Sequence, residues 1–477
     1  MPDSTQLDRK TLPIRPRLLL LLGPGLVWMA LAQGSGELIW WPYIVAKYGL
    51  AFLFLLVPAA LLQFPVCFEI GRYTLLTGEG VFTGFFRLNR YFGLALWVLF
   101  ILSNLWFGAF ASAGGTALAA LFPYPADWSH EARSLLFGQC SIIFFTAALL
   151  FANRVYVLIE WVMKIVAIVS LLGMVAACFH PAVRDVLAEF LTGLVSPDTA
   201  EINRFFATAD TQDQDRLLTA ITFTGLGGFW TLFYSYWIKE KGAGMAAHTP
   251  PMQGLLSSVA SIRTGTGSLP EDHPEAPTRL RAWYRYLSVE TLIGILGNLA
   301  TTLMACLLAY ALLRPAGRFP EGFEIAVVQA DFFAASWGNT GRIIFLFIAG
   351  AFLTDTYLAT VDCVARIHID ALHSLFPKTK NHDTRRYYYT IVLALAVITS
   401  ATMFLDQPGP LIILSAVIGF AGTVIYAIAL ILLNHRKLRN QLPTQLRSGK
   451  LSLSAIALAA ACYLTLAAAY IFVKFIR

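Results

Sequence analysis

Long apolar stretches recur along the whole chain, separated by short polar segments. Stretches of about 20 apolar residues are typical of helices that cross a lipid bilayer. We expect about eleven such spans, at residues 17–47, 50–76, 92–122, 134–152, 155–179, 217–238, 287–313, 341–372, 387–405, 410–433 and 451–475. The pattern therefore predicts an all-α membrane protein with many crossings.

Two of these spans are interrupted by glycine-rich segments. The first span is cut at residues 34–37 and the sixth at residues 224–228. Hydrocarbon cannot satisfy the backbone groups of a broken helix, so a break persists only where it lines a polar cavity or binds something. Small residues also serve helix packing, but a matched pair of breaks five spans apart indicates a secondary transporter built from inverted repeats.

Composition and charge agree with a membrane protein. The chain is 57% hydrophobic and 13% charged, whereas soluble domains carry about a quarter charged residues. The net charge of +7 does not indicate nucleic-acid binding, because basic residues crowd the loops at 378–386 and 436–450. The positive-inside rule then places the N-terminus in the cytoplasm. An odd number of spans places the C-terminus outside.

Nothing in the sequence indicates an enzyme. The segments outside the spans are too short for a catalytic domain, and there is no H-E-x-x-H motif or nucleophile elbow. The six cysteines show no C-x-x-C spacing, which argues against a disulfide framework or a thiolate metal site. We expect no covalently bound cofactor and no obligatory protein partner, only the lipid bilayer and a small ionic solute.

Ionisable residues within spans are costly and usually functional. Glu160 and Lys164 are four residues apart on one helical face, so we expect them to pair. Glu37 follows the first break, where the positive end of a half-helix stabilises a carboxylate. It either caps that half-helix or faces the solute as a ligand or proton carrier.

The eighth span places an acid among hydroxyl groups. Asp355 lies between Thr354 and Thr356, and oxygen ligands of this kind suit Na⁺, Mg²⁺ or a proton rather than a soft metal. The alternative is a neutral acid that hydrogen-bonds between helices.

In its broken first span and its eighth span the chain resembles the NRAMP family, in the amino-acid–polyamine–organocation superfamily. The resemblance runs from Gly23-Pro24-Gly25 through the first break to residues 46–49 and on to residues 76–79, and extends loosely over all the spans. It implies the LeuT-type fold, in which two inverted five-helix repeats and one extra helix work by alternating access. The first repeat would cover 17–180 and the second 217–433. The remaining segments would be a cytosolic tail at 1–16, an extracellular loop at 181–216, cytosolic loops at 239–286 and 434–450, and helix 11 at 451–477.

The chain departs from the family at the residues that hold metal. The family's DPGN break aligns with residues 34–37, which puts Gly34 at the metal-binding Asp and Glu37 at the Asn. The MPH segment aligns with residues 228–230, so its thioether ligand is also missing. The acidic residues expected along span three align near Phe107 and Phe110, which removes that proton route. Transition metals need anionic or soft ligands, so Mn²⁺ or Fe²⁺ transport at this site is not expected.

What remains is backbone at two half-helix N-termini, which favours a small anion such as bicarbonate or a short carboxylate. The segment Gly34-Ser35-Gly36 also resembles the GSG break by which amino-acid transporters of the superfamily hold a carboxylate. The predicted substrate site comprises Gly34, Ser35, Gly36, Glu37, Gly225, Gly227, Gly228, Phe229 and Trp230. The resemblance implies that Thr354, Asp355 and Thr356 bind Na⁺ or H⁺ as the coupling ion. Two alternatives stay open: a divalent cation such as Mg²⁺ with Glu37 as substitute ligand, and a sensor that binds solute without transport.

Overall fold

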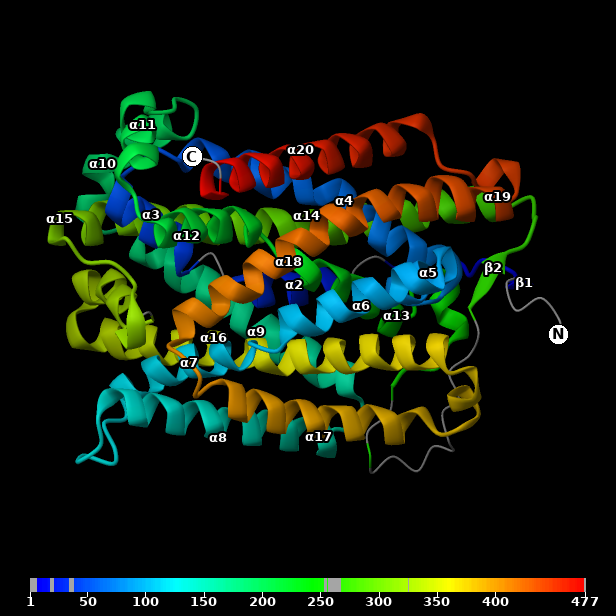
Figure 1. The fold of residues 1–477 in the computed structure, drawn as a ribbon, viewed down its shortest axis with the longest axis horizontal. Helices are drawn as coiled ribbons and strands as arrows, with labels where there is room; N and C mark the ends of the chain where they lie inside the picture. Colours follow the sequence, from blue (N-terminus) through cyan, green and yellow to red (C-terminus); the bar gives the residue numbers. More distant parts are fainter. Residues whose placement is uncertain are drawn as a thin grey trace.

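The computed structural model describes residues 7–17, 21–33, 38–252, 255, 267–324 and 326–475. Its helices run mostly along the long axis of the molecule, as a membrane bundle requires (Figure 1). The strand β1 (Asp8–Lys10) lies at one end of this axis. The helix α11 (Thr199–Thr208) and the C-terminal end of α20 (Lys450–Phe475) lie at the other. We call these the β1 end and the α11 end. Termini at opposite ends agree with an odd number of crossings.

Eight helical segments of the described chain are long and apolar enough to cross a membrane. The helices that form them are α4 (Leu56–Thr77), α6 (Arg90–Asn104) with α7 (Gly108–Leu121), α8 (His130–Phe151), α9 (Val155–Ala177), α14 (Ala276–Leu308), α16 (Asp331–Leu375), α18 (Pro408–Leu430) and α20 (Lys450–Phe475). The other expected spans are the pair α2 (Pro24–Ala32) and α3 (Trp40–Tyr48), the pair α12 (Thr211–Thr222) and α13 (Phe233–Glu240), and the helix α17 (Thr384–Thr402). The first and sixth spans are thus broken, as the glycine pattern predicts.

Short elements connect the spans. They are η2 (Leu53–Leu55), α5 (Val81–Leu88), α10 (Pro181–Gly193), α11 (Thr199–Thr208), η3 (Gly228–Leu232), η4 (Gly244–His248), η5 (Ala309–Leu313), α15 (Arg314–Ala316), η6 (Gly322–Glu324), η7 (Val328–Ala330), η8 (Pro377–Asn381), η9 (Ile431–Leu438), α19 (Arg439–Gln441) and η10 (Thr444–Leu446). The strands β1 (Asp8–Lys10) and β2 (Ser268–Pro270) pair in parallel at the β1 end.

Several expected boundaries differ from those observed. The seventh span begins at Ala276, inside the expected loop at 239–286, and the tenth continues through η9 and α19 to Gln441, inside the expected loop at 434–450. The N-terminal tail and the loop at 239–286 contribute one strand each to the sheet, which the all-α expectation did not include. Polar helix ends extend beyond the apolar stretch, so hydropathy alone places their limits too far inward.

The third span is also broken, which the sequence analysis did not predict. α6 ends at Asn104 and α7 begins at Gly108. The Asn104 side chain donates to the carbonyl of Phe100 at 2.9 Å and accepts from Trp230 Nε1 at 3.3 Å. A side chain that bonds to its own helix backbone competes with the helical ladder. Asn104 thus stands at the interruption with one local and one long-range hydrogen bond.

Candidate substrate and ion sites

Three glycines shape the second break. Gly225, Gly227 and Gly228 have φ angles of 114°, 63° and 52°, which side-chain-bearing residues rarely adopt. An added Cβ on Gly227 would lie 2.1 Å from the carbonyl oxygen of Thr222. The chain can therefore turn from α12 into η3 only with glycine at this point. Gly225, Gly227 and Gly228 are all buried, as a site at membrane depth requires.

Neighbouring side chains occupy the carbonyl oxygens of this break. Gln63 Nε2 of α4 donates to the carbonyl of Thr224 at 2.5 Å. Tyr426 Oη of α18 donates to the carbonyl of Gly228 at 2.6 Å. Each of these two carbonyl oxygens therefore already accepts one hydrogen bond from a side chain.

The backbone N–H groups of the same break differ from these carbonyls, because they lack hydrogen-bond partners among the described residues. Within the described part of the chain, the backbone N–H groups of Leu226, Gly227 and Gly228 have no hydrogen-bond partner. A buried donor without a partner costs about 1–3 kcal/mol. Unpaired donors at the start of a half-helix favour a negative charge, because the helix dipole adds to their effect.

Aromatic rings surround the start of η3. Trp230 packs against Phe223 and Phe110, with ring centroids 5.7 and 4.8 Å away. Phe229 lies 6.1 Å from the ring of Tyr426. Phe229 and Trp230 therefore lie at the break, and the ring of Phe110 from α7 packs against Trp230.

A cavity of about 10 Å³ lies against this break, between α4, α12, η3 and α18. This is about the volume that a single water needs. The cavity on this side of the second break therefore has room for no more than about one water.

The first break is delimited by its flanking helices. α2 ends at Ala32 and α3 begins at Trp40; Gly34, Ser35, Gly36 and Glu37 lie outside the described residues. Trp41 Nε1 donates to Thr224 Oγ1 at 2.8 Å. The structure thus brings α3, the second half of the first span, onto the second break.

A buried acid, not singled out from the sequence, holds the other end of α2. Glu290 of α14 accepts from the N–H groups of Gly23 and Gly25 at 3.0 and 2.5 Å. This carboxylate caps a helix that has no capping side chain of its own. Glycine at position 25 lets Glu290 approach so closely, because a Cβ on Gly25 would lie 2.3 Å from the Glu290 carbonyl oxygen; a Cβ on Gly23 would instead lie 2.4 Å from Glu160 Oε1.

The predicted ion-binding residues lie together on α16. Thr354, Asp355 and Thr356 are all buried, and Asp355 is only 1% exposed. No other side chain among the residues that the structure describes donates to either carboxylate oxygen of Asp355. The Thr354 hydroxyl donates to the carbonyl of Gly350 at 2.6 Å, which leaves its oxygen lone pairs available. α16 contacts both α2 and α9, so this acid lies on a helix that packs beside the first span.

The predicted pair of Glu160 and Lys164 is confirmed. Lys164 Nζ lies 2.5 Å from Glu160 Oε1. Lys241, which follows α13, lies 2.7 Å from the same oxygen. Sequence spacing reveals the first partner but not the second, because Lys241 reaches Glu160 only through the fold.

Polar networks tie the half-helices at both ends of the bundle. At the α11 end, Asp213 of α12 accepts from Tyr43 and Lys47 of α3, both at 2.7 Å. Arg216 Nη1 lies 2.7 Å from Asp213 and 3.2 Å from Glu321. We call this set the Asp213 cluster. It fastens α3 and α12, the halves of the broken spans at the α11 end, to each other.

At the β1 end, Arg366 of α16 joins three elements. Its guanidinium pairs with Asp362 at 2.9 Å and with Glu240 at the end of α13. Tyr388 of α17 donates to Asp362 at 2.5 Å. The second half of the sixth span, α13, is therefore fastened to α16, and Asp362 is a structural partner of Arg366.

Among the described residues, no group of three His, Cys, Asp or Glu side chains is arranged to hold a metal ion. Gly228, Phe229 and Trp230 in the second break carry neither a thioether nor an anionic side chain.

Comparisons with known proteins place the fold among membrane transporters. The chain is similar to the structure of an Eremococcus coleocola manganese transporter bound to an aromatic bis-isothiourea compound, with 14% identity and a TM-score of 0.62 over 98% of this chain and 91% of that one. A histidine-to-alanine mutant of the same transporter gives 12% identity and a TM-score of 0.61, with 98% and 91% covered. MhsT in complex with L-phenylalanine gives 16% identity and a TM-score of 0.55, with 98% and 100% covered.

These likenesses show a LeuT-type fold, shared by the NRAMP-family manganese transporter and MhsT. No family model matches the chain. No curated protein matches it in sequence.

Proposed function

We propose that the protein is a secondary active transporter that moves a small anion, bicarbonate or a short carboxylate, by alternating access. The single observation that carries this proposal is the state of the second break. Its carbonyls at Thr224 and Gly228 already accept hydrogen bonds, while the N–H groups of Leu226, Gly227 and Gly228 have no partner within the described chain. Backbone N–H groups that have no partner at the start of a half-helix suit an anion.

The first break would complete this site. Gly34, Ser35 and Gly36 would add backbone N–H groups and a hydroxyl from the opposite side, next to Trp41. Glu37 would then have to be protonated, capped or turned away, because an ionised carboxylate repels a bound anion.

A divalent cation is the second candidate, and the likeness to a manganese transporter favours it. In that case Glu37 would supply the charge that Gly34 cannot. The unpaired N–H groups of the second break support the anion instead.

We further propose that Asp355, with Thr354 or Thr356, binds the coupling ion. Uptake of an anion against a negative-inside potential costs about 2.3 kcal/mol per charge at 100 mV, so a cation must accompany it. A carboxylate that is buried and has no side-chain partner among the described residues supports a site for Na⁺ or H⁺.

For the orientation, we propose that the β1 end faces the cytoplasm, in agreement with the basic loops at 378–386 and 436–450. The Asp213 cluster would then be the external gate, and the contact of Arg366 with Glu240 the cytoplasmic one.

The test is uptake into liposomes that contain the purified protein. Labelled bicarbonate, Mg²⁺ and Mn²⁺ are compared with and without an inward Na⁺ gradient and a pH gradient. We expect saturable bicarbonate uptake that depends on a cation gradient. The contrary result is saturable Mn²⁺ or Mg²⁺ uptake that is lost in Glu37→Gln, with no uptake of bicarbonate. It would show that the substrate is a divalent cation rather than an anion.

A further inference from the structure

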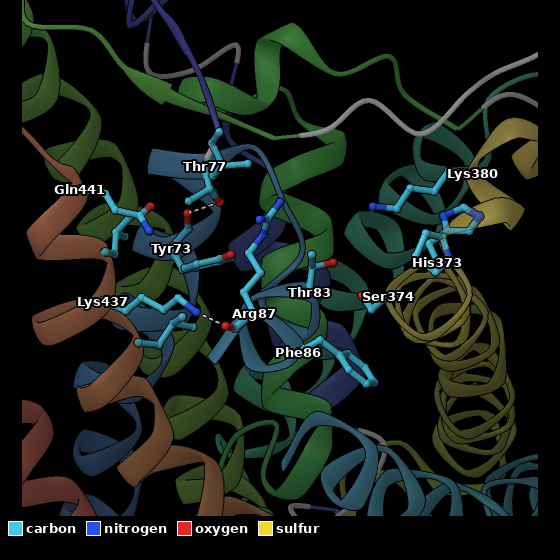
Figure 2. Close-up of a pocket in the computed structure, with 14 residues that line it drawn as sticks. Tyr73, Thr77, Thr83, Phe86, Arg87, His373, Ser374, Lys380, Lys437 and Gln441 are labelled. Carbon is cyan, nitrogen blue, oxygen red and sulfur yellow. Dashed lines mark hydrogen bonds between the residues drawn. The ribbon is translucent and has the colours of Figure 1, made fainter. Parts of the chain in front are cut away.

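A second polar cavity lies at the β1 end, far along the bundle from the broken helices. It has a volume of about 290 Å³ and lies between α4, α5, the end of α16, η8 and η9 (Figure 2). We infer that this cavity binds a phosphate-bearing anion. We call it the basic pocket, and it is separate from the substrate and ion sites.

The charge of the basic pocket is one-sided. Arg87, Lys380 and Lys437 line it, and among the described residues no Asp or Glu does. Arg87 is balanced from behind by Glu79, whose oxygens lie 2.8 and 2.7 Å from the guanidinium. Neither lysine pairs with a carboxylate among the described residues. The pocket therefore keeps two ammonium groups without a counter-charge.

The two lysines converge on one space. Figure 2 shows Lys437 and Lys380 extending toward Arg87 from opposite walls of the pocket. Lys437 Nζ donates to the backbone carbonyl of Arg87, which holds it at the wall. Within the described chain Lys380 Nζ has no partner. The positive-inside rule accounts for basic residues at this end of the bundle, but it does not require them to meet inside a cavity.

Neutral donors complete the lining. The side chains of Thr83, Ser374 and Gln441 lie in the wall, and the described residues offer them no hydrogen-bond partner. A phosphate accepts several charge-assisted hydrogen bonds at once, and lysine binds it as a point charge. Ammonium groups with hydroxyl and amide donors around one space are therefore suited to a phosphate.

The size of the pocket limits the ligand. A volume of about 290 Å³ lies at the lower end for small-molecule sites, which fits a phosphate, a small phosphorylated molecule or the head group of a phospholipid. These share one chemistry. A ligand in this position would join the ends of α5, α16 and η9, because each contributes a lining residue.

The experiment uses the full-length protein in nanodiscs and measures its thermal unfolding midpoint. One arm has neutral lipid and inorganic phosphate, with sodium chloride at equal ionic strength as the reference. The other has phosphatidylglycerol and no phosphate. The variants are Lys380→Gln and Lys437→Gln, and Lys378→Gln is the matched control because Lys378 carries the same charge on η8 and does not line the pocket.

We expect a rise in the midpoint for the wild type and the control, with the apparent phosphate affinity falling tenfold or more in Lys380→Gln. A response confined to the phosphate arm identifies a soluble phosphate as the ligand, and one confined to the phosphatidylglycerol arm identifies a head group. Equal responses of Lys380→Gln, Lys437→Gln and the control in both arms would overturn the inference.

Discussion

At the residue scale, the second break depends on side chains that lie far away in the sequence. Tyr426 and Gln63 satisfy two of its carbonyls from α18 and α4. The sequence indicates the break itself, because glycines cluster at 225–228. It does not indicate Tyr426 or Gln63, because neither stands at a helical spacing from the break and both reach it only in the folded bundle.

Tyr426→Phe tests how much the hydrogen bond from Tyr426 to the Gly228 carbonyl stabilises the protein. The change removes the donor to the Gly228 carbonyl and leaves a buried acceptor unsatisfied, so we expect a loss of about 1–3 kcal/mol in the free energy of unfolding. Thermal or denaturant unfolding in detergent measures it. Tyr310→Phe is the control, since Tyr310 bonds to Glu189 at the surface. Equal losses in both variants would show that the contact with Gly228 has no special weight.

Asp355→Asn tests the coupling site. The amide keeps the size of the side chain but cannot carry a negative charge or a transferable proton. We expect solute binding to persist and the dependence of uptake on a Na⁺ or H⁺ gradient to vanish. The measurement is liposome uptake with each gradient applied in turn. Asp362→Asn is a poor substitute for this test, because Asp362 pairs with Arg366. Unchanged gradient dependence in Asp355→Asn would remove the coupling proposal.

At the element scale, hydropathy and glycine clusters predict the spans and the two breaks, and helical spacing predicts the pair of Glu160 and Lys164. The break in the third span was missed, because no glycine cluster marks it and the bond between Asn104 and Trp230 forms only in the folded bundle. The ion pairs at both ends of the bundle were missed for the same reason: Lys47 with Asp213, and Glu240 with Arg366, join residues more than a hundred positions apart. Patterns over a few neighbouring residues do not predict such long-range pairs.

The Asp213 cluster makes a prediction about pH. Burial raises the pKa of Asp213, which precedes the apolar part of the sixth span, but hydrogen bonds from its neighbours more than offset this and lower the pKa to about 2. These neighbours are Lys47, Tyr48, Tyr43 and Arg216. Because the folded pKa lies below the unfolded value of about 3.9, the stabilisation is full above about pH 4 and is lost as the pH falls toward about 2.

Comparison with Asp213→Asn isolates this contribution. We expect the wild type to exceed the variant by about 2 kcal/mol in unfolding free energy above pH 4. The difference should shrink steadily between about pH 4 and pH 2. Unfolding midpoints measured across that range provide the test, with Asp198→Asn at an exposed helix cap as control. A difference that does not change with pH would contradict the role of the Asp213 charge.

At the scale of the whole molecule, one arrangement joins the two broken spans. Half-helices from two broken spans meet near Trp41 and Thr224, and polar contacts fasten them at both ends of the bundle. Opening at one end while the other stays fastened is the change that alternating access requires. The resemblance to NRAMP proteins in the sequence predicted this fold, while the solute cannot be deduced from the fold because related transporters carry different cargoes.

Orientation is a property of the whole chain and can be tested directly. We expect a reporter that is active only outside the cytoplasm, such as alkaline phosphatase, to be inactive when fused to the loop at 436–450 and active at the C-terminus. A fluorescent protein that folds only in the cytoplasm should give the opposite result. Activity of both phosphatase fusions would contradict the assigned topology.

The central claim is that backbone donors, rather than side-chain ligands, hold the solute. The most direct measurement is a cryo-EM structure in nanodiscs with bicarbonate, and a parallel one with Mn²⁺ in its place. The account predicts density for a small anion within hydrogen-bond distance of the Gly227 and Gly228 N–H groups, and no ion at the breaks in the Mn²⁺ sample. A dehydrated Mn²⁺ coordinated by Glu37 and break carbonyls, with no density in the bicarbonate sample, would contradict it.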